Sequence, residues 1–536
     1  MANQLFTPKP LHVFHEELKG ENRLKRVLGP LQLTTLGIGA IIGTGIFVLT
    51  GVAAHDKTGP ALMLSFVVAG IACIFAAMCY AEFAAMVPVA GSAYTYAYAT
   101  LGELFAWIIG WDLVLEYAVG SATVANGWSH YFQDFIGLFG IHLPKALTGA
   151  PFDYNPTLGH IVSTPGVYMN LPAMIIVFIL TVVLVKGVQE SASFNAIMVI
   201  IKLAVVVFVI AVGAFYVNPS NWTNNFAPYG YTGISFFGHI LSGQTDAGGA
   251  PLGMVAGAAT IFFAYIGFDA VSTQAEEAKN PQKDVPFGII TSLVVCTLLY
   301  IAVAAVLTGM VPYDQIDINA PVSQAFASVG LPWAQFLISI GALTGITSVL
   351  LVMLLSQPRV LLAMARDGLI PTGFFADVHE KFKTPWKSTI LTGIFVALMA
   401  SFIPLRILAE LVNIGTLLAF VIVCAAVLVM RKTNPDAHRP FRVPFSPLFP
   451  ILGILICLLL MFSLPVENWY RLIIWLGIGF LIYFTYGRRH SHMRNLPHEI
   501  QAHGVSPAGS PVADPMAPPA FPEEPVDAQL PPDDAK

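Results

Sequence analysis

About a dozen apolar stretches of roughly 20 residues run through this 536-residue chain, and each can cross a hydrocarbon core of about 30 Å at about 1.5 Å per helical residue. Hydrophobic residues make up 56% of the chain and charged residues 11%, whereas an average soluble domain has roughly 25% charged residues. The mean hydropathy is +0.72. These values exclude a soluble globular protein. The fold class that they predict is an all-α polytopic membrane protein.

The apolar stretches can be placed as twelve spans. When both ends of the chain are cytoplasmic, nearly all of the 26 lysine and arginine residues fall on the cytoplasmic side. This asymmetry predicts cytoplasmic N- and C-termini and supports an even number of spans. The residues left in outer loops are Lys57, Lys145, Arg406 and Arg471. The predicted spans are 32–54, 61–86, 104–135, 170–187, 191–217, 251–275, 286–311, 331–364, 387–404, 407–430, 448–465 and 468–487.

The order of spans and loops predicts five regions. They are a cytoplasmic N-terminal segment over 1–30, a first repeat over 31–217, a second repeat over 251–430, two further spans over 447–487 and a cytoplasmic tail over 490–536. The tail is proline-rich, acidic and poor in large apolar residues, so it is expected to be disordered. The outer loops over 136–169 and 218–250 are rich in Gly, Pro, Asn and Thr, which favours irregular caps.

Charge and composition narrow the classes of function. The net charge of −5 leaves no basic face for nucleic acid, and the histidines have no metal-ligand spacing. The five cysteines lie singly in apolar stretches, which indicates small core residues and neither disulfides nor a redox site. A membrane enzyme is disfavoured because the sequence shows no nucleophile with a histidine and an acid, and no metal motif. We therefore expect no cofactor and no metal.

Glycines interrupt the first span around Gly43 and Gly45, in the sequence TTLGIGAIIGTGIFVLTG. Such a density of glycine weakens a helix and exposes its backbone. The GxxxG pair of Gly39 and Gly43 alone indicates only close helix packing. The sixth span, however, has a matching interruption near Gly267, followed by Asp269. Broken helices in corresponding positions of two halves are typical of the binding site of an inverted-repeat transporter.

A break in a helix offers binding groups without charged side chains. The amide N–H groups on one side and the carbonyl groups on the other lose their helical partners. A half-helix N-terminus can bind a carboxylate, and the opposing carbonyls can bind an ammonium group. The breaks therefore suit a zwitterionic amino acid. A channel would instead need rings of carbonyls or charges from several subunits or repeats, and the sequence indicates none.

Lys202 lies in the middle of the fifth span, where a lysine costs at least about 3 kcal/mol on insertion scales. It is a candidate to carry a proton, or else a structural lysine held by backbone carbonyls. Asp269 is a second candidate for proton coupling. Glu116 in the third span is a third, for which a purely structural hydrogen bond is an equal alternative. Asp112, nearer the cytoplasmic part of that span, indicates local architecture more than chemistry.

Three motifs carry a resemblance to a known superfamily. They are GIGAIIGTGIF in the first span, FFAYIGFDAVST followed by EEAKNPQKDVP in the sixth, and SQPRVLLAMARDGLIP at the end of the eighth. Together they resemble the amino acid, polyamine and organocation (APC) transporter superfamily, and within it the bacterial members of the cationic amino acid transporter family. The resemblance covers about residues 25–487. It implies a five-plus-five inverted repeat with spans one and six unwound at the site, in a bacterial inner membrane.

The resemblance also implies roles for residues at the two breaks. The substrate carboxylate would bind backbone amides, the ammonium group would bind backbone carbonyls, and one aromatic ring would close over the substrate. The amides are those of Gly43, Thr44 and Gly45, the carbonyls are those of Ile41, Phe263, Ala264 and Ile266, and the ring is that of Phe263.

Further roles are implied for proton coupling. Lys202 matches a fifth-span lysine that takes the place of a sodium ion in proton-coupled relatives. It would bridge first-span carbonyls and an eighth-span hydroxyl such as Ser348. Asp269 matches an acidic position linked to proton sensing in some relatives. Glu116 and Tyr300 match further positions near the pocket.

These observations predict a proton-coupled symporter that imports L-amino acids by alternating access. The motif positions beside a substrate side chain include no acidic residue, and the eighth-span stretch VLLVML is bulky and apolar. We therefore expect a small or apolar substrate such as alanine. The alternatives are an exchanger of amino acids or a polyamine, and an amino acid sensor that signals through the tail. The expected partners are substrate, protons and the lipid bilayer. The sequence leaves open a small membrane subunit, the proton stoichiometry and the oligomeric state.

Overall fold

The computed structural model describes residues 5–10, 28–87, 91–155, 160–186, 191–275, 278–382 and 384–495. Most of the predicted N-terminal segment and of the predicted tail therefore lies outside the described residues. The described chain is mostly helical, which confirms the polytopic all-α prediction. Eight of its helical stretches are long and apolar enough to cross a membrane, and shorter apolar helices accompany them.

The first and sixth spans are each divided into pieces. The first consists of α3 (Pro30–Ile41), η1 (Gly45–Leu49), α4 (Thr50–Ala53) and η2 (Ala54–Thr58). The sixth consists of α11 (Met254–Ile261), η6 (Phe262–Tyr265) and α12 (Ala270–Thr273). Both interruptions coincide with the glycines of the sequence motifs. We call residues 42–44 the first break and residues 266–269 the second break.

The other spans are continuous helices. Most of their ends lie within a few residues of the ends of the predicted apolar stretches. They are α5 (Leu62–Met86), α7 (Glu103–Gly137), α8 (Leu171–Lys186), α9 (Ser191–Gly213), α13 (Pro281–Met310), α15 (Pro332–Arg366), α17 (Trp386–Phe402), α18 (Leu405–Thr433), α19 (Leu448–Met461) and α20 (Val466–Ile482). Their outward faces carry large exposed apolar side chains, for example Phe178 on α8 and Ile474 on α20, as expected of helices that contact lipid.

The connecting loops contain more order than the predicted irregular caps. Three antiparallel pairs lie in them: β1 (Phe152–Asn155) with β2 (His160–Ser163), β3 (Ile234–Phe236) with β4 (His239–Ser242), and β5 (Gln244–Thr245) with β6 (Pro251–Leu252). Short helices are α6 (Ser92–Thr100), α10 (Ser220–Thr223), α14 (Pro321–Ser328), α16 (Thr372–Phe375) and α21 (Arg488–His490). The strands have two to four residues, too few for a clear alternating pattern in a glycine-rich sequence.

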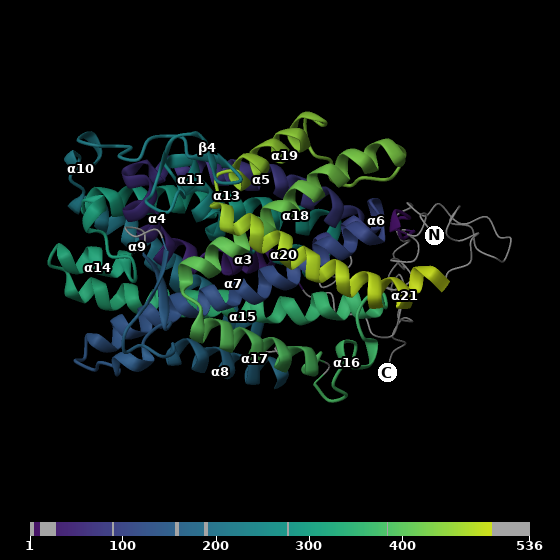
Figure 1. Ribbon diagram of the computed structural model, residues 1–536, viewed down its shortest axis with the longest axis horizontal. Helices are drawn as coiled ribbons and strands as arrows, with labels where there is room; N and C mark the ends of the chain where they lie inside the picture. Colours follow the sequence, from purple (N-terminus) through teal and green to yellow (C-terminus); the bar gives the residue numbers. More distant parts are fainter. Residues whose placement is uncertain are drawn as a thin grey trace, which may run out of the picture.

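The long helices run along the long axis of the molecule, with α6, α16 and α21 at one end and α10 and α14 at the other (Figure 1). We call these the terminus end and the α14 end. At the terminus end, Lys9 Nζ lies 2.9 Å from Asp367 Oδ1, and the backbone N–H of His492 donates to the Asp367 carbonyl at 3.0 Å. Asp367 therefore joins the two described ends of the chain to the end of α15.

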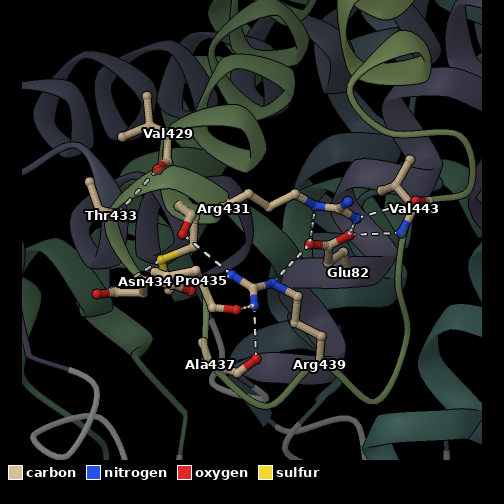
Figure 2. Close-up of polar contacts among 10 residues, drawn as sticks. Glu82, Val429, Arg431, Thr433, Asn434, Pro435, Ala437, Arg439 and Val443 are labelled. Carbon is tan, nitrogen blue, oxygen red and sulfur yellow. Dashed lines mark hydrogen bonds and ion pairs between the residues drawn. The ribbon is translucent and has the colours of Figure 1, made fainter.

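A buried charge network fixes the loop between α18 and α19 at the same end. Figure 2 shows the guanidinium groups of Arg431 and Arg439 converging on Glu82 of α5. Arg431 donates to both carboxylate oxygens, at 3.2 and 2.6 Å, and the Val443 N–H donates at 2.7 Å. Arg439 also donates to backbone carbonyls of its own loop, including that of Ala437 at 2.8 Å. Glu82 thus joins the ends of α5 and α18.

The α14 end is joined by a second set of polar contacts. Lys57 Nζ lies 3.2 Å from Glu410 Oε1 and donates to Thr260 Oγ1 at 2.9 Å. Arg406 donates to Asp56 at 3.0 Å. These contacts connect η2, the last piece of the first span, with α11 and α18.

Candidate substrate and coupling site

The first break exposes backbone groups where α3 stops and η1 starts. Ile42 has extended backbone angles, with φ −75° and ψ 104°, and the helix resumes at Gly45. The N–H groups of Ile46 and Phe47 both donate to the Gly43 carbonyl at 3.2 Å. The amides of Gly43, Thr44 and Gly45 therefore stand at a helix N-terminus, where N–H groups have no partner within the helix.

The second break has a backbone turn that only glycine adopts readily. Ile266 is extended, with φ −59° and ψ 135°, and Gly267 has φ +118°. A Cβ atom at Gly267 would lie 2.7 Å from the Ala40 carbonyl oxygen, and one at Gly45 would overlap Ala264. Glycine at both positions thus allows the segments at the two breaks, including the residues that flank them, to approach closely.

Tyr300 of α13 joins the two breaks through its hydroxyl group. This hydroxyl lies 2.8 Å from the Ile41 carbonyl oxygen and 2.9 Å from the Ala264 carbonyl oxygen. The side chain is fully buried. Both oxygens belong to the set predicted to bind an ammonium group. The hydroxyl has one hydrogen, which it gives to one of the two oxygens or shares between them. Because a carbonyl oxygen has two lone pairs, each can still accept from a ligand.

Helices α7 and α15 approach the first break from the rest of the bundle. The Thr44 hydroxyl donates to the Val124 carbonyl of α7 at 3.4 Å. Val349 of α15 lies 2.7 Å from the place where a Cβ atom at Gly43 would be. A buried apolar cluster of Ala40, Ala270 and Val352 lies in the same region. The Phe263 ring is almost fully buried. The side chains around the breaks are therefore mainly apolar.

The structure brings Lys202 to the first break. Lys202 Nζ donates to the carbonyls of Gly39 at 2.5 Å and Ile42 at 2.9 Å, and to Ser348 Oγ at 2.9 Å. Gly345 leaves room for the lysine, since a Cβ atom there would lie 3.1 Å from Lys202 Cβ. The ammonium group thus has three acceptors, which satisfies a buried lysine. This geometry suits both readings of Lys202, the structural one and the proton-carrying one.

The acidic candidates form a separate group beside the second break. Asp269 Oδ2 accepts a hydrogen bond from the Tyr117 hydroxyl at 2.6 Å. Asp269 Oδ1 and Glu116 Oε1 have no hydrogen-bond partner among the described residues. Glu116 is close enough to Asp269 and to Asp112 to interact electrostatically with both. Sequence reasoning missed Tyr117, and the one available signal was its place next to Glu116.

The helical fold and the paired breaks are those expected of a membrane transporter, and comparison with known proteins gives the family. The chain matches the amino acid permease family over residues 28–483, and it belongs to that family. Methylthioribose transporter of Bacillus subtilis (strain 168) is 48% identical over 489 residues, which cover 91% of this chain and 99% of the relative. Branched-chain amino acid permease BcaP of the same organism is 49% identical over 494 residues, 92% and 100% of the two chains.

A plant relative is more distant. Vacuolar cationic amino acid transporter 4 of Arabidopsis thaliana is 38% identical over 417 residues, 78% of this chain and 65% of the relative. These matches confirm the family that the motifs predicted, and they indicate a multi-pass membrane transporter rather than an enzyme.

Proposed function

We propose that this chain is a proton-coupled symporter that imports apolar L-amino acids across a bacterial plasma membrane by alternating access. The observation that supports this most is the position of Lys202, whose ammonium group bridges the Ile42 carbonyl at the first break and Ser348 on α15. The ammonium group would take the place that the family resemblance gives to a sodium ion in sodium-coupled relatives. Loss and gain of one proton at Nζ would loosen and restore that bridge.

The substrate's charged groups would bind at the two breaks. Its carboxylate would accept hydrogen bonds from the amides of residues 43–45, at the helix N-terminus. Its ammonium group would donate to the carbonyls of Ile41, Phe263, Ala264 and Ile266. Tyr300 supports this arrangement because its hydroxyl fixes two of these carbonyls relative to each other.

The substrate's side chain would lie against apolar neighbours. Val349 and Val352 on α15 and the Phe263 ring provide no carboxylate that could pair with a cationic side chain. The name of the branched-chain amino acid permease supports an apolar substrate as well. We therefore propose substrates from alanine to the branched-chain amino acids, and we expect arginine to be a poor substrate.

Methylthioribose uptake is a second candidate, because a methylthioribose transporter is 48% identical over almost its whole length. This substrate is a thioether sugar with neither an ammonium group nor a carboxylate. It would gain little from the opposed half-helix ends, which attract charge. Competition between the two classes of substrate therefore shows which one the breaks serve.

Alternating access would involve the two proposed repeats, 31–217 and 251–430, with the terminus end facing the cytoplasm. The positive charges of the sequence support this orientation. Exchange of internal for external substrate remains the alternative mode of transport on the same site.

Uptake by the purified protein in proteoliposomes tests the proposal. Radiolabelled L-alanine, L-isoleucine, L-arginine and methylthioribose are compared with and without an inward proton gradient, with sodium, and with internal substrate. We expect gradient-driven uptake of isoleucine or alanine that Lys202→Ala abolishes. Lys145→Ala, at an exposed loop lysine, serves as control. Uptake that ignores the gradient, or that needs sodium or internal substrate, contradicts proton symport.

A further inference from the structure

Asp112 is a buried acid that the proposed mechanism does not yet use. It lies on α7 with 1% of its surface exposed. Neither of its carboxylate oxygens has a hydrogen-bond partner among the described residues. A structural aspartate in an apolar interior normally accepts several hydrogen bonds, because an unpaired polar group is costly to bury. Direct hydrogen bonds among the described residues therefore do not account for the burial of Asp112.

Asp134 on the same helix shows what a structural aspartate looks like in this protein. Its carboxylate accepts from Ser323 at 2.8 Å, Gln324 at 2.5 Å, Gln335 at 3.3 Å and Ser339 at 2.9 Å. These donors join α7 to α14 and α15. Asp112 has no such set of donors, although it is more deeply buried.

Asp112 lies near the two acidic candidates for proton coupling, Glu116 and Asp269. Glu116 lies four residues further along α7, so both carboxyl groups lie on one face of the helix, about 5–6 Å apart at their Cβ atoms. Glu116 in turn interacts with Asp269 at the second break. Because α7 begins at the terminus end with Glu103, Asp112 lies between the breaks and that end.

In the part of the chain that the structure describes, no cation pairs with any of the three acids. The groups that face them are the Tyr117 hydroxyl of α7, Tyr80 of α5, Tyr96 of α6 and Thr416 of α18. Gly415 of α18 lies directly against Asp112, since a Cβ atom there would be 3.5 Å from Oδ1. Among the described residues, no lysine or arginine forms an ion pair with any of the three. Three carboxylates without a cation partner among the described residues cannot all be ionised together at acceptable cost.

We propose that Asp112 is a further proton carrier and the third acid of the route, which takes the proton from the Glu116 and Asp269 pair and passes it toward the terminus end. In each step one carboxyl group gives a proton to a neighbouring carboxylate, so charge is conserved. The proposal rests on proton symport as the function. It identifies Asp112 as the residue through which the proton leaves the substrate site.

The test separates proton-driven accumulation from exchange in proteoliposomes with radiolabelled L-isoleucine. Exchange of internal for external isoleucine needs the substrate site but no net proton movement. We expect Asp112→Asn to exchange isoleucine at a rate within about twofold of the parent. Its gradient-driven accumulation should be lower by about tenfold or more, as expected when an intramembrane proton relay is interrupted. Asp134→Asn makes the same chemical change on the same helix, and it should leave the ratio of the two activities unchanged.

Other outcomes overturn the proposal. Accumulation at the parent level shows that no proton passes Asp112, and loss of both activities shows a structural role. If Asp112→Asn does not yield folded protein, Asp112→Glu decides, because the acid is kept but displaced. An unchanged pH profile of accumulation in Asp112→Glu then excludes a carrier role, whereas a displaced profile supports it. A parent protein that ignores the gradient contradicts proton symport itself, whatever the variants do.

Discussion

The Lys202 ammonium group and the Ser348 hydroxyl lie 2.9 Å apart, although 146 residues separate them in the chain. The contact joins α9 to α15 beside the first break. It places one titratable group where three chain segments meet.

Removing the Ser348 hydroxyl should take away one of the three hydrogen-bond acceptors of Lys202 and leave the other two. Ser348→Ala leaves Lys202 with two carbonyl acceptors, and loss of a bond to a charged group costs about 1.5–3 kcal/mol. We expect slower proton-driven uptake and a lower melting temperature. Ser356→Ala on the same helix is the control, because that hydroxyl bonds only to the Val352 carbonyl of its own helix among the described residues. If Ser348→Ala and Ser356→Ala changed uptake and melting temperature equally, Ser348 would have no special role at Lys202.

Tyr300→Phe should raise the substrate KM. The phenol hydroxyl holds the Ile41 and Ala264 carbonyls together, and the ring of phenylalanine fills the same space. Losing about 1–2 kcal/mol of carbonyl positioning corresponds to a KM higher by roughly tenfold. Tyr265→Phe removes a comparable buried hydroxyl that bonds to the Phe66 carbonyl instead. Concentration-dependent uptake measures both, and a larger KM change in Tyr265→Phe would contradict the assignment.

Gly267→Ala should abolish transport. Its φ of +118° is unfavourable for alanine, and the added methyl group would lie 2.7 Å from the Ala40 carbonyl oxygen. The strain, of order 1–3 kcal/mol, must be relieved by moving the two breaks apart. Gly477→Ala, where nothing lies within 4 Å, is the matched control. Substrate binding by the detergent-purified variants measures the effect, and normal binding by Gly267→Ala would show that the breaks need not touch.

Glu82→Gln should lower the stability of the protein and leave substrate binding and transport largely unchanged. The glutamate neutralises two arginines in a buried setting, and removing one partner of such a network costs about 3–5 kcal/mol. Thermal unfolding in detergent should show a clearly lower melting temperature, with a normal KM for the protein that remains folded. An unchanged melting temperature would mean that the network in Figure 2 is not structural.

The sequence predicts the helices and both breaks because these features depend on local composition. Apolar stretches of sufficient length define the spans, and the glycines at Gly43, Gly45 and Gly267 identify where the spans divide. The partners of Lys202 could be named only through the family resemblance. The contact of Tyr117 with Asp269 joins residues 152 positions apart, so it depends on how two helices rotate against each other, which periodicity within one span does not determine.

The network around Glu82 shows the same limit. Its partner Arg431 is 349 residues away, and in the sequence that arginine is one of many cytoplasmic positive charges. Asp112 shows the limit in another way. Its position in a span is visible in the sequence, but only packing shows that neither carboxylate oxygen has a partner.

The most direct test of proton coupling is to follow protons while substrate enters. Proteoliposomes with a pH-sensitive dye inside receive external L-isoleucine without any imposed gradient. The parent should acidify the lumen as isoleucine enters, and Lys202→Ala should not. Entry of radiolabelled isoleucine into the parent without acidification would contradict proton symport.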